Sequence, residues 1–294
     1  MKVSLNIARE YDGFLFLAES ARNPPILFSH CHEELELNLI VNGEVTYVLD
    51  GRSYTSGRGS LLWMFPSQEH QLINRTPDAE YYVAVFKPNL IERACKSRAY
   101  RELKEESPRK DGLLRSILKP TQMTRLESLM EAAMEGSIDA DILNREGGFG
   151  IESDFRYSHP DPDALNAGLR YLLLLSWRYQ SEMNSGAESH ALHPSVRRAL
   201  AFLSEQDENE SLESLAKRCG VSAAYLSRIF RRQVGIPLSQ YRNSLRLGRF
   251  WESYSQESSQ TLTEAMFAAG FGSYAQFYRV FKEAYGRGPR DVLN

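Results

Sequence analysis

Two segments in the last third of the chain resemble each other, and they constrain its fold more than any other feature. They read LAKRCGVSAAYLSRIFRRQVG and MFAAGFGSYAQFYRVFKEAYG. Each has an apolar-patterned stretch, a glycine, a serine, and then an aromatic-containing stretch with arginine or lysine. Glycine permits a left-handed turn, and serine caps a following helix. The pattern therefore predicts two helix-turn-helix units in an all-α C-terminal domain over residues 194–294.

The two predicted second helices carry polar side chains on the face opposite their apolar residues. In the first unit, Ser211 and Ser222 are the predicted helix caps and Gly220 is the turn. In the second unit, Gly270 is the turn and Ser273 the cap. The helical period places these side chains outside: Ser227, Arg228, Arg231 and Arg232, then Tyr274, Gln276, Tyr278, Arg279 and Lys282. Such helices fit the major groove of double-stranded DNA.

The charge distribution favours the same partner. The whole chain has 35 Lys+Arg and 38 Asp+Glu. From His193 onward we count 14 basic and 10 acidic residues, a balance of +4, which leaves 21 and 28, a balance of −7, for the rest. An acidic body with a basic tail indicates that the tail meets a polyanion.

The C-terminal region, from about His193, resembles the DNA-binding domain of AraC/XylS-type transcription regulators. The resemblance rests on the two segments above, on YRNSLRL between them, and on the final AYG with its following proline. It implies base-reading roles for Ala224, Ser227, Arg228, Tyr274, Gln276, Tyr278 and Arg279, and phosphate contacts for Arg231, Arg232 and Lys282. The chain departs from the family at Phe250, Ala265, Met266 and Gly288, and we expect bulk to be exchanged between facing core positions.

The N-terminal part of the chain alternates short apolar runs with glycine-containing turns such as VNGE and LDGRS. This is typical of an antiparallel barrel or sandwich. We therefore predict an α+β multidomain chain: a cupin-like barrel over residues 1–90, a helical extension over 91–185 that includes a loop over 142–161, and a linker over 186–193. In the extension, Leu165, Leu169, Leu172 and Leu173 share one helical face, which suits either packing on the barrel or a homodimer contact.

A candidate pocket lies in the predicted barrel. His30, His32 and Glu36 share strand parity, and His70 follows on a later strand. Together they resemble cupin motifs: H-x-H-x3-E-x6-G is complete, but the segment from Pro66 to His70 is one residue shorter than usual. The four side chains suit a divalent Zn, Fe, Mn or Ni ion, although the reading requires no cofactor. They also suit a hydroxyl-rich ligand such as a sugar, with Tyr47 and Trp63 as walls, or plain burial with satisfied hydrogen bonds.

Together these patterns predict a ligand-responsive, sequence-specific transcription regulator rather than an enzyme. A small-molecule effector would change its binding to DNA. The family resemblance implies activation, with RNA polymerase as a further partner. The alternatives are a metal-dependent cupin enzyme, such as an oxygenase or isomerase, and a metal sensor with a DNA-binding tail. Three cysteines, no apolar signal core and no long apolar stretch predict a cytoplasmic protein with no membrane contact.

Overall fold

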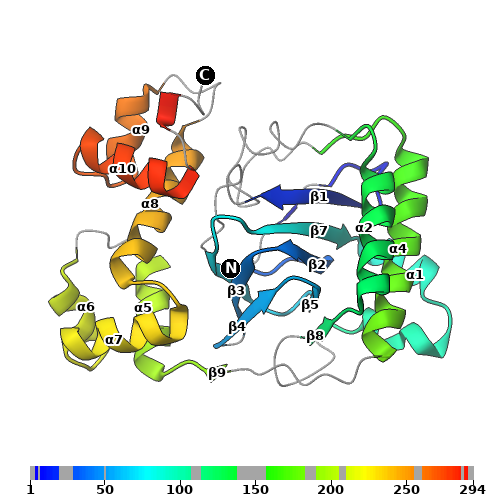
Figure 1. The fold of residues 1–294 in the computed structure, drawn as a ribbon, viewed down its shortest axis with the longest axis horizontal. Coiled ribbons are helices and arrows are strands. Elements are labelled where there is room, and N and C mark those ends of the chain that lie inside the picture. The colour runs from blue at the N-terminus through cyan, green and yellow to red at the C-terminus, as the bar shows by residue number, and fades with distance from the viewer. Residues whose placement is uncertain are drawn as a thin grey trace.

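The computed structural model describes residues 4–5, 7–19, 29–49, 51–106, 114–137, 157–182, 190–204, 210–254, 260–285 and 288–290. A β-rich N-terminal part carries helices on its outer side, and an all-helical C-terminal part lies on the other side (Figure 1). This confirms the predicted α+β class with two different parts. None of the described helices is long and apolar enough to cross a membrane.

The β-rich part consists of two antiparallel sheets. One has the order β1 (Gly13–Glu19), β7 (Glu80–Phe86), β2 (Leu35–Asn42), β5 (Ser60–Met64) and β8 (Leu114–Ile117). The other has the order β6 (His70–Arg75), β3 (Glu44–Leu49), β4 (Arg52–Gly57) and β9 (His190–Ala191). The hairpin between β2 and β3 turns at Gly43, whose φ of 61° suits glycine.

Strand β2 has one apolar face and one polar face. Leu35, Leu37 and Leu39 are fully buried on one face, because side chains alternate along a strand. Glu36 and Asn38 occupy the other face, where they meet the polar cluster described below. The apolar face is covered by helices.

Those helices are α1 (Pro88–Ala94), the 3-10 helix η1 (Arg98–Lys104), α2 (Pro120–Met134) and α4 (Pro162–Glu182). In Figure 1, α2 and α4 lie side by side against the sheet, and the structure gives them direct contacts. All four predicted leucines of α4 have no exposed surface and join the sheet core. Of the two alternatives for this face, packing within the chain is the one observed.

Two strands lie where none was expected. Leu114–Ile117, within the predicted helical extension, forms β8 and pairs with β5. Residues 190–191 of the predicted linker form β9 and pair with β4; residues 186–189 lie outside the described residues, as does most of the predicted loop over 142–161. Both strands pair with residues far away in the sequence, so no local sequence pattern predicts them.

The helical part is built around two cores along one connecting helix. Its elements are α5 (Pro194–Ser204), α6 (Leu212–Arg218), α7 (Ala223–Val234), α8 (Leu238–Ser253), α9 (Leu262–Ala268) and α10 (Tyr274–Tyr285). In the second core, Phe250, Ala265 and Met266 are all fully buried. The Phe250 ring lies 4.7 Å from that of Phe277. The large side chain thus fills space in the core to which the small Ala265 belongs.

Candidate functional site

The two helix-turn-helix units have the turns and caps expected of them. Gly220 and Gly270 adopt left-handed φ angles of 73° and 85°. The Ser222 hydroxyl accepts a hydrogen bond from the Tyr225 amide at 3.3 Å and begins α7. Ser273 accepts from the Gln276 amide at 3.2 Å at the start of α10. Each cap satisfies an amide that the helix itself leaves unpaired.

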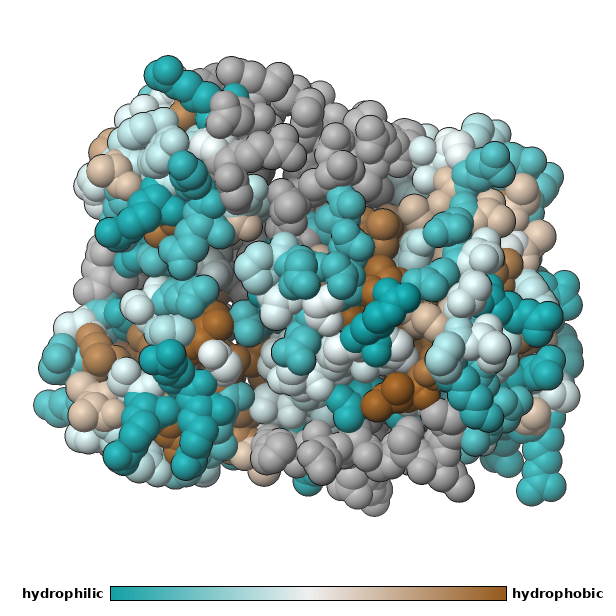
Figure 2. All heavy atoms as spheres, in the orientation of Figure 1, coloured by the Kyte–Doolittle hydropathy of each residue, from teal (hydrophilic) through white to brown (hydrophobic). Residues whose placement is uncertain are grey.

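The second helix of each unit, α7 and α10, presents the predicted side chains to solvent. In α7, Leu226, Ile229 and Phe230 are buried. The exposed residues are Ala224, Ser227, Arg228, Arg231, Arg232, Tyr274, Tyr278, Arg279 and Lys282. Figure 2 shows hydrophilic residues over much of the visible face of α6 and α7. The Arg228 guanidinium lies 5.6 Å from the centre of the Tyr225 ring, within the range of a cation–π contact.

Gln276 differs from the other predicted base readers. It is only partly exposed, and its Oε1 accepts a hydrogen bond from the Gly272 amide at 3.1 Å. This bond fixes the turn before α10. The bond occupies one of the two acceptor positions of Oε1, which reduces the capacity of Gln276 to read an adenine with one donated and one accepted bond.

The recognition helices α7 and α10 border one concave surface of about 440 Å³. Ser227 comes from α7, and Gln276 and Arg279 come from α10. Both helices therefore face the same side of the molecule. Helix α8, between them, contributes Arg242, Asn243 and Arg246. Sequence reasoning did not single out these three residues, although Ser239, Arg242, Asn243 and Arg246 have the spacing of one helical face.

The predicted polar cluster of the β-rich part is brought together. The imidazoles of His30, His32 and His70 are buried, and their ligand atoms lie within 4.8 Å of one another. His30 and His70 exchange two backbone hydrogen bonds of 3.1 and 2.9 Å, which places β6 beside the first histidine pair. Glu36 Oε2 lies 3.1 Å from His32 Nε2 and 3.7 Å from His70 Nε2.

Hydrogen bonds fix the ring nitrogens of two of these histidines. His32 Nδ1 donates to the Glu34 carbonyl at 3.0 Å, and His70 Nδ1 donates to the Gln68 carbonyl at 3.1 Å. Both Nε2 atoms are therefore directed into the cluster. The Nε2 of His70 is buried and has no hydrogen-bond partner among the described residues. This lone pair is available to a ligand or a metal ion.

The charges within the cluster are unevenly divided. Burial raises the pKa of Glu36, but hydrogen bonds from His32 and Asn38 and the nearby imidazoles lower it to about 2. Burial lowers the pKa of His70 to about 3, so its ring is neutral. Burial also lowers the pKa of His32, but its contacts with Glu36 and Glu34 outweigh this and raise it. The favoured arrangement is a His32 imidazolium paired with the Glu36 carboxylate, beside a neutral His70.

We predict that, with a chelator present, stability falls as the pH drops from about 6.5 to about 3, because His70 binds a proton over this window only in the unfolded chain. The stabilisation by Glu36 is present above about 4.5 and is also lost toward about 2. That of His32 has the opposite sign and is lost above 6.5. Urea unfolding at a series of pH values gives the free energy of unfolding. Between about pH 6.5 and 3 this free energy should change less steeply with pH in His70→Gln than in the control His159→Gln. Equal slopes in these two variants would contradict the assignment.

Tyr47 and Trp63, the predicted aromatic walls, have different surroundings. The Tyr47 hydroxyl accepts from Asn38 Nδ2 at 3.4 Å, and Asn38 also donates to Glu36 at 2.8 Å, so Tyr47 borders the cluster. Trp63 does not line this cluster. It is paired with Leu37, on the other face of the sheet. Its ring packs at 5.4 Å against Trp177 of α4. The strand parity of β5 explains the difference.

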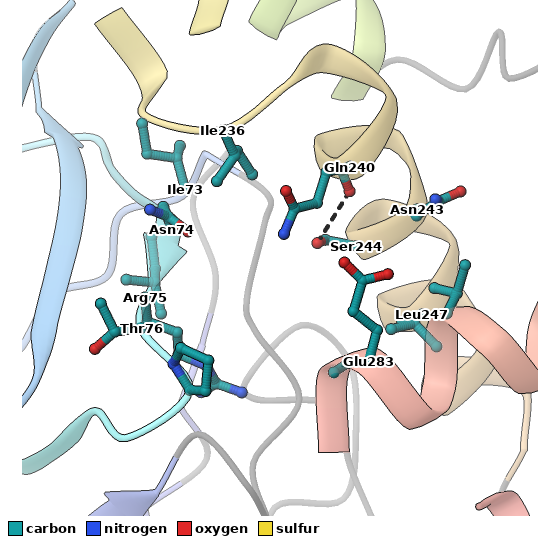
Figure 3. Close-up of a pocket in the computed structure, with 14 residues that line it drawn as sticks. Ile73, Asn74, Arg75, Thr76, Ile236, Gln240, Asn243, Ser244, Leu247 and Glu283 are labelled. Carbon is teal, nitrogen blue, oxygen red and sulfur yellow. Dashed lines mark hydrogen bonds between the residues drawn. The ribbon is translucent and has the colours of Figure 1, made fainter. Parts of the chain in front are cut away.

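Strand β6 joins the cluster to the helical part. Gln71, the residue after His70, donates a 2.7 Å hydrogen bond to the Tyr241 hydroxyl of α8, and both side chains are buried. Ile73 packs in the core of α5, α6, α7 and α8. Beyond it, Figure 3 shows Asn74, Arg75 and Thr76 across a cleft of about 150 Å³ from Gln240 and Ser244 of α8. The same strand thus contacts the cluster through His70 and the helical part through Gln71 and Ile73.

These features define a class of protein: a two-domain DNA-binding regulator with a sensor domain. A model of the AraC-like ligand binding domain matches residues 15–146, and a helix-turn-helix domain model matches residues 215–294. The chain belongs to the AraC family of transcription regulators. It is a ligand-responsive regulator that binds DNA sequence-specifically.

Two relatives are similar over nearly their whole length. The HTH-type transcriptional activator RhaS of Citrobacter koseri is 23% identical over 275 residues, which cover 90% of this chain and 86% of that protein. RhaS of Klebsiella pneumoniae is 23% identical over 293 residues, 95% and 92% of the two chains. A match to a solved structure of ToxT from Vibrio cholerae covers 96% of this chain and 97% of that chain, at 14% identity and a TM-score of 0.35.

Proposed function

We propose that this regulator is a transcription activator whose effector site is the cluster of His30, His32, Glu36 and His70. Binding at the cluster changes DNA affinity through strand β6. The observation that carries the proposal is the division of β6: His70 faces the cluster, while Gln71 and Ile73 contact the helical part. An occupant that bonds to His70 therefore acts on the strand that holds Tyr241 of α8.

A divalent metal ion fits the cluster. Three neutral imidazoles and a carboxylate are the donor set that Zn, Fe, Mn and Ni accept, and the orphaned Nε2 of His70 is a ready donor. His32 would have to release its proton, so metal affinity should rise with pH. A bound ion would supply positive charge beside Glu36. His70 and His32 would be held by their carbonyl partners in the orientation that binding needs.

A hydroxyl-rich small molecule is the second candidate. Asn38 Oδ1 is buried and has no hydrogen-bond partner among the described residues, while Nδ2 of the same amide donates to the Tyr47 hydroxyl. A ligand hydroxyl could donate to this oxygen. To distinguish a sugar-like effector from a metal ion, each is added separately to protein that a chelator has freed of metal, and the affinity for DNA is measured.

The proposal also includes activation through RNA polymerase, a cytoplasmic location and a homodimer. The relatives are transcription activators, which supports activation through RNA polymerase and argues for a sensor domain without turnover. DNA binding supports a cytoplasmic location.

A homodimer would need a surface other than the leucine face of α4. Tyr171, which is 52% exposed, lies on the outer side of that helix. Sedimentation of wild type and Tyr171→Glu would test this surface.

The coupling can be tested with Gln71→Leu/Tyr241→Phe. Because both partners of this bond become apolar, neither leaves the other as an unpaired buried polar group. We expect the double variant to bind metal as wild type does and to lose most of the metal-induced change in affinity for a preferred duplex. The duplex is selected by the wild-type protein from a random library, and affinity is read by fluorescence anisotropy.

The matched control is Tyr11→Phe, which removes a buried hydroxyl that bonds His159 within the sensor domain. It should keep the full metal response. A double variant that also keeps the full response would show that the signal does not pass through this bond.

A further inference from the structure

The concave surface between α7 and α10 contains more positive charge than the recognition helices themselves provide. Arg242 and Arg246 of α8 and Arg279 of α10 line it, and no acidic residue is among the described residues that do. Arg242 and Arg246 lie one helical turn apart, so their charges repel each other. Burial and the charge of Arg246 lower the pKa of Arg242 and outweigh the opposing effect of the Glu210 carboxylate.

The guanidinium of Arg242 is incompletely satisfied. Its Nε and Nη2 atoms are buried and have no hydrogen-bond partner among the described residues. A half-buried cation with open N–H groups is costly to a folded protein unless an anion completes it. The neighbouring Arg246 donates to Asn243 Oδ1 at 3.2 Å. The side chain of Arg242, partly exposed, lines the concave surface that both recognition helices share.

The geometry of DNA places phosphates opposite this surface. Helix α8 has 16 residues, which corresponds to about 24 Å at 1.5 Å per residue. When two recognition helices enter successive major grooves on one side of a duplex, the minor groove lies between them. The phosphates at its edges then face α8. A planar guanidinium with adjacent free N–H groups matches the oxygens of a phosphodiester.

We infer that Arg242, with Arg246 and Ser239 on the same helical face, forms a phosphate-binding site for the DNA backbone between the two major grooves. The inference rests on the proposed placement of α7 and α10 in DNA. Its role is distinct from base reading: Arg242 fixes the register of both recognition helices and contributes equally to every sequence. Its unsatisfied donors are the cost of this arrangement in the protein without DNA.

The test measures affinity against salt for the selected duplex and for a random duplex. Arg242→Gln should weaken both by a similar factor and reduce the slope of log affinity against log salt by about 1. Arg242→Lys should keep most of the slope, because the charge remains. Arg178→Ala, which removes an exposed arginine of the sensor helix α4, should match wild type.

A structural role for Arg242 would lower stability on substitution. We expect instead an unchanged or higher midpoint of thermal unfolding in Arg242→Gln, since an incompletely bonded charge is removed. Wild-type affinity and slope in Arg242→Gln, with Arg228→Ala losing preference for the selected duplex, would overturn this inference alone. No loss of preference in Arg228→Ala would count against the placement of α7 itself.

Discussion

Replacing both Arg228 and Arg279 with alanine is expected to weaken binding to the selected duplex by about 2–6 kcal/mol, roughly 30-fold to more than ten-thousand-fold. Both side chains are exposed, one on each recognition helix. Each can form paired hydrogen bonds to a guanine edge. The two helices belong to different cores, so the losses should add.

A control variant distinguishes contacts to base edges from contacts to the phosphate backbone. Arg231→Ala, on the same helix as Arg228, should weaken selected and random duplexes alike, because a phosphate contact carries no sequence information. The Arg228→Ala/Arg279→Ala variant should lose far more affinity for the selected duplex than for the random duplex. An equal loss on both duplexes would assign these arginines to the backbone, and no loss would remove them from the interface.

The second large effect concerns the cluster. His70→Gln should lower the affinity for a divalent metal by at least about 100-fold, since changes even to groups behind the ligands cost about 10–100-fold. Glutamine keeps a polar group near the Gln68 carbonyl but lacks the imidazole Nε2 lone pair. Isothermal titration with Zn²⁺, Mn²⁺, Fe²⁺ and Ni²⁺ in turn measures this directly.

His159→Gln provides the matched comparison. His159 is also a buried histidine of the sensor domain, but it bonds to Asp161 and lies outside the cluster. Its variant should bind metal as wild type does. Equal affinity in wild type and His70→Gln would remove His70 from the ligand set, provided both unfold at similar temperatures.

The helix-turn-helix units could be predicted to within a residue because their signals are local. Gly220 with Ser222, and Gly270 with Ser273, define turn and cap within a few positions. The outward faces of α7 and α10 follow from the helical period. Gln276 is the exception, because its bond to the Gly272 amide depends on how the turn closes.

The sensor domain was less predictable because its contacts are long-range. His30, His32 and Glu36 do lie together, but the single regular strand expected for them is not present, because β2 begins at Leu35 and both histidines precede it. Strand parity also could not show that Trp63 lies against α4. His70 reaches the cluster despite the shortened approach from Pro66, since Gln68 closes a tight turn with two hydrogen bonds to the Phe65 backbone. The link from Gln71 to Tyr241 spans 170 residues, and no sequence period marks it. A cupin relationship stays a prediction based on the motif.

We propose that occupation of the histidine cluster controls DNA affinity. The most direct measurement is the affinity of wild type and His70→Gln for the selected duplex, by anisotropy, in chelator and with each of the four metals. We predict that at least one metal changes wild-type affinity by about tenfold or more, a coupling of about 1.4 kcal/mol, and that His70→Gln abolishes the change. A metal that binds the wild-type cluster without changing DNA affinity, or a response that persists in His70→Gln, would contradict the account.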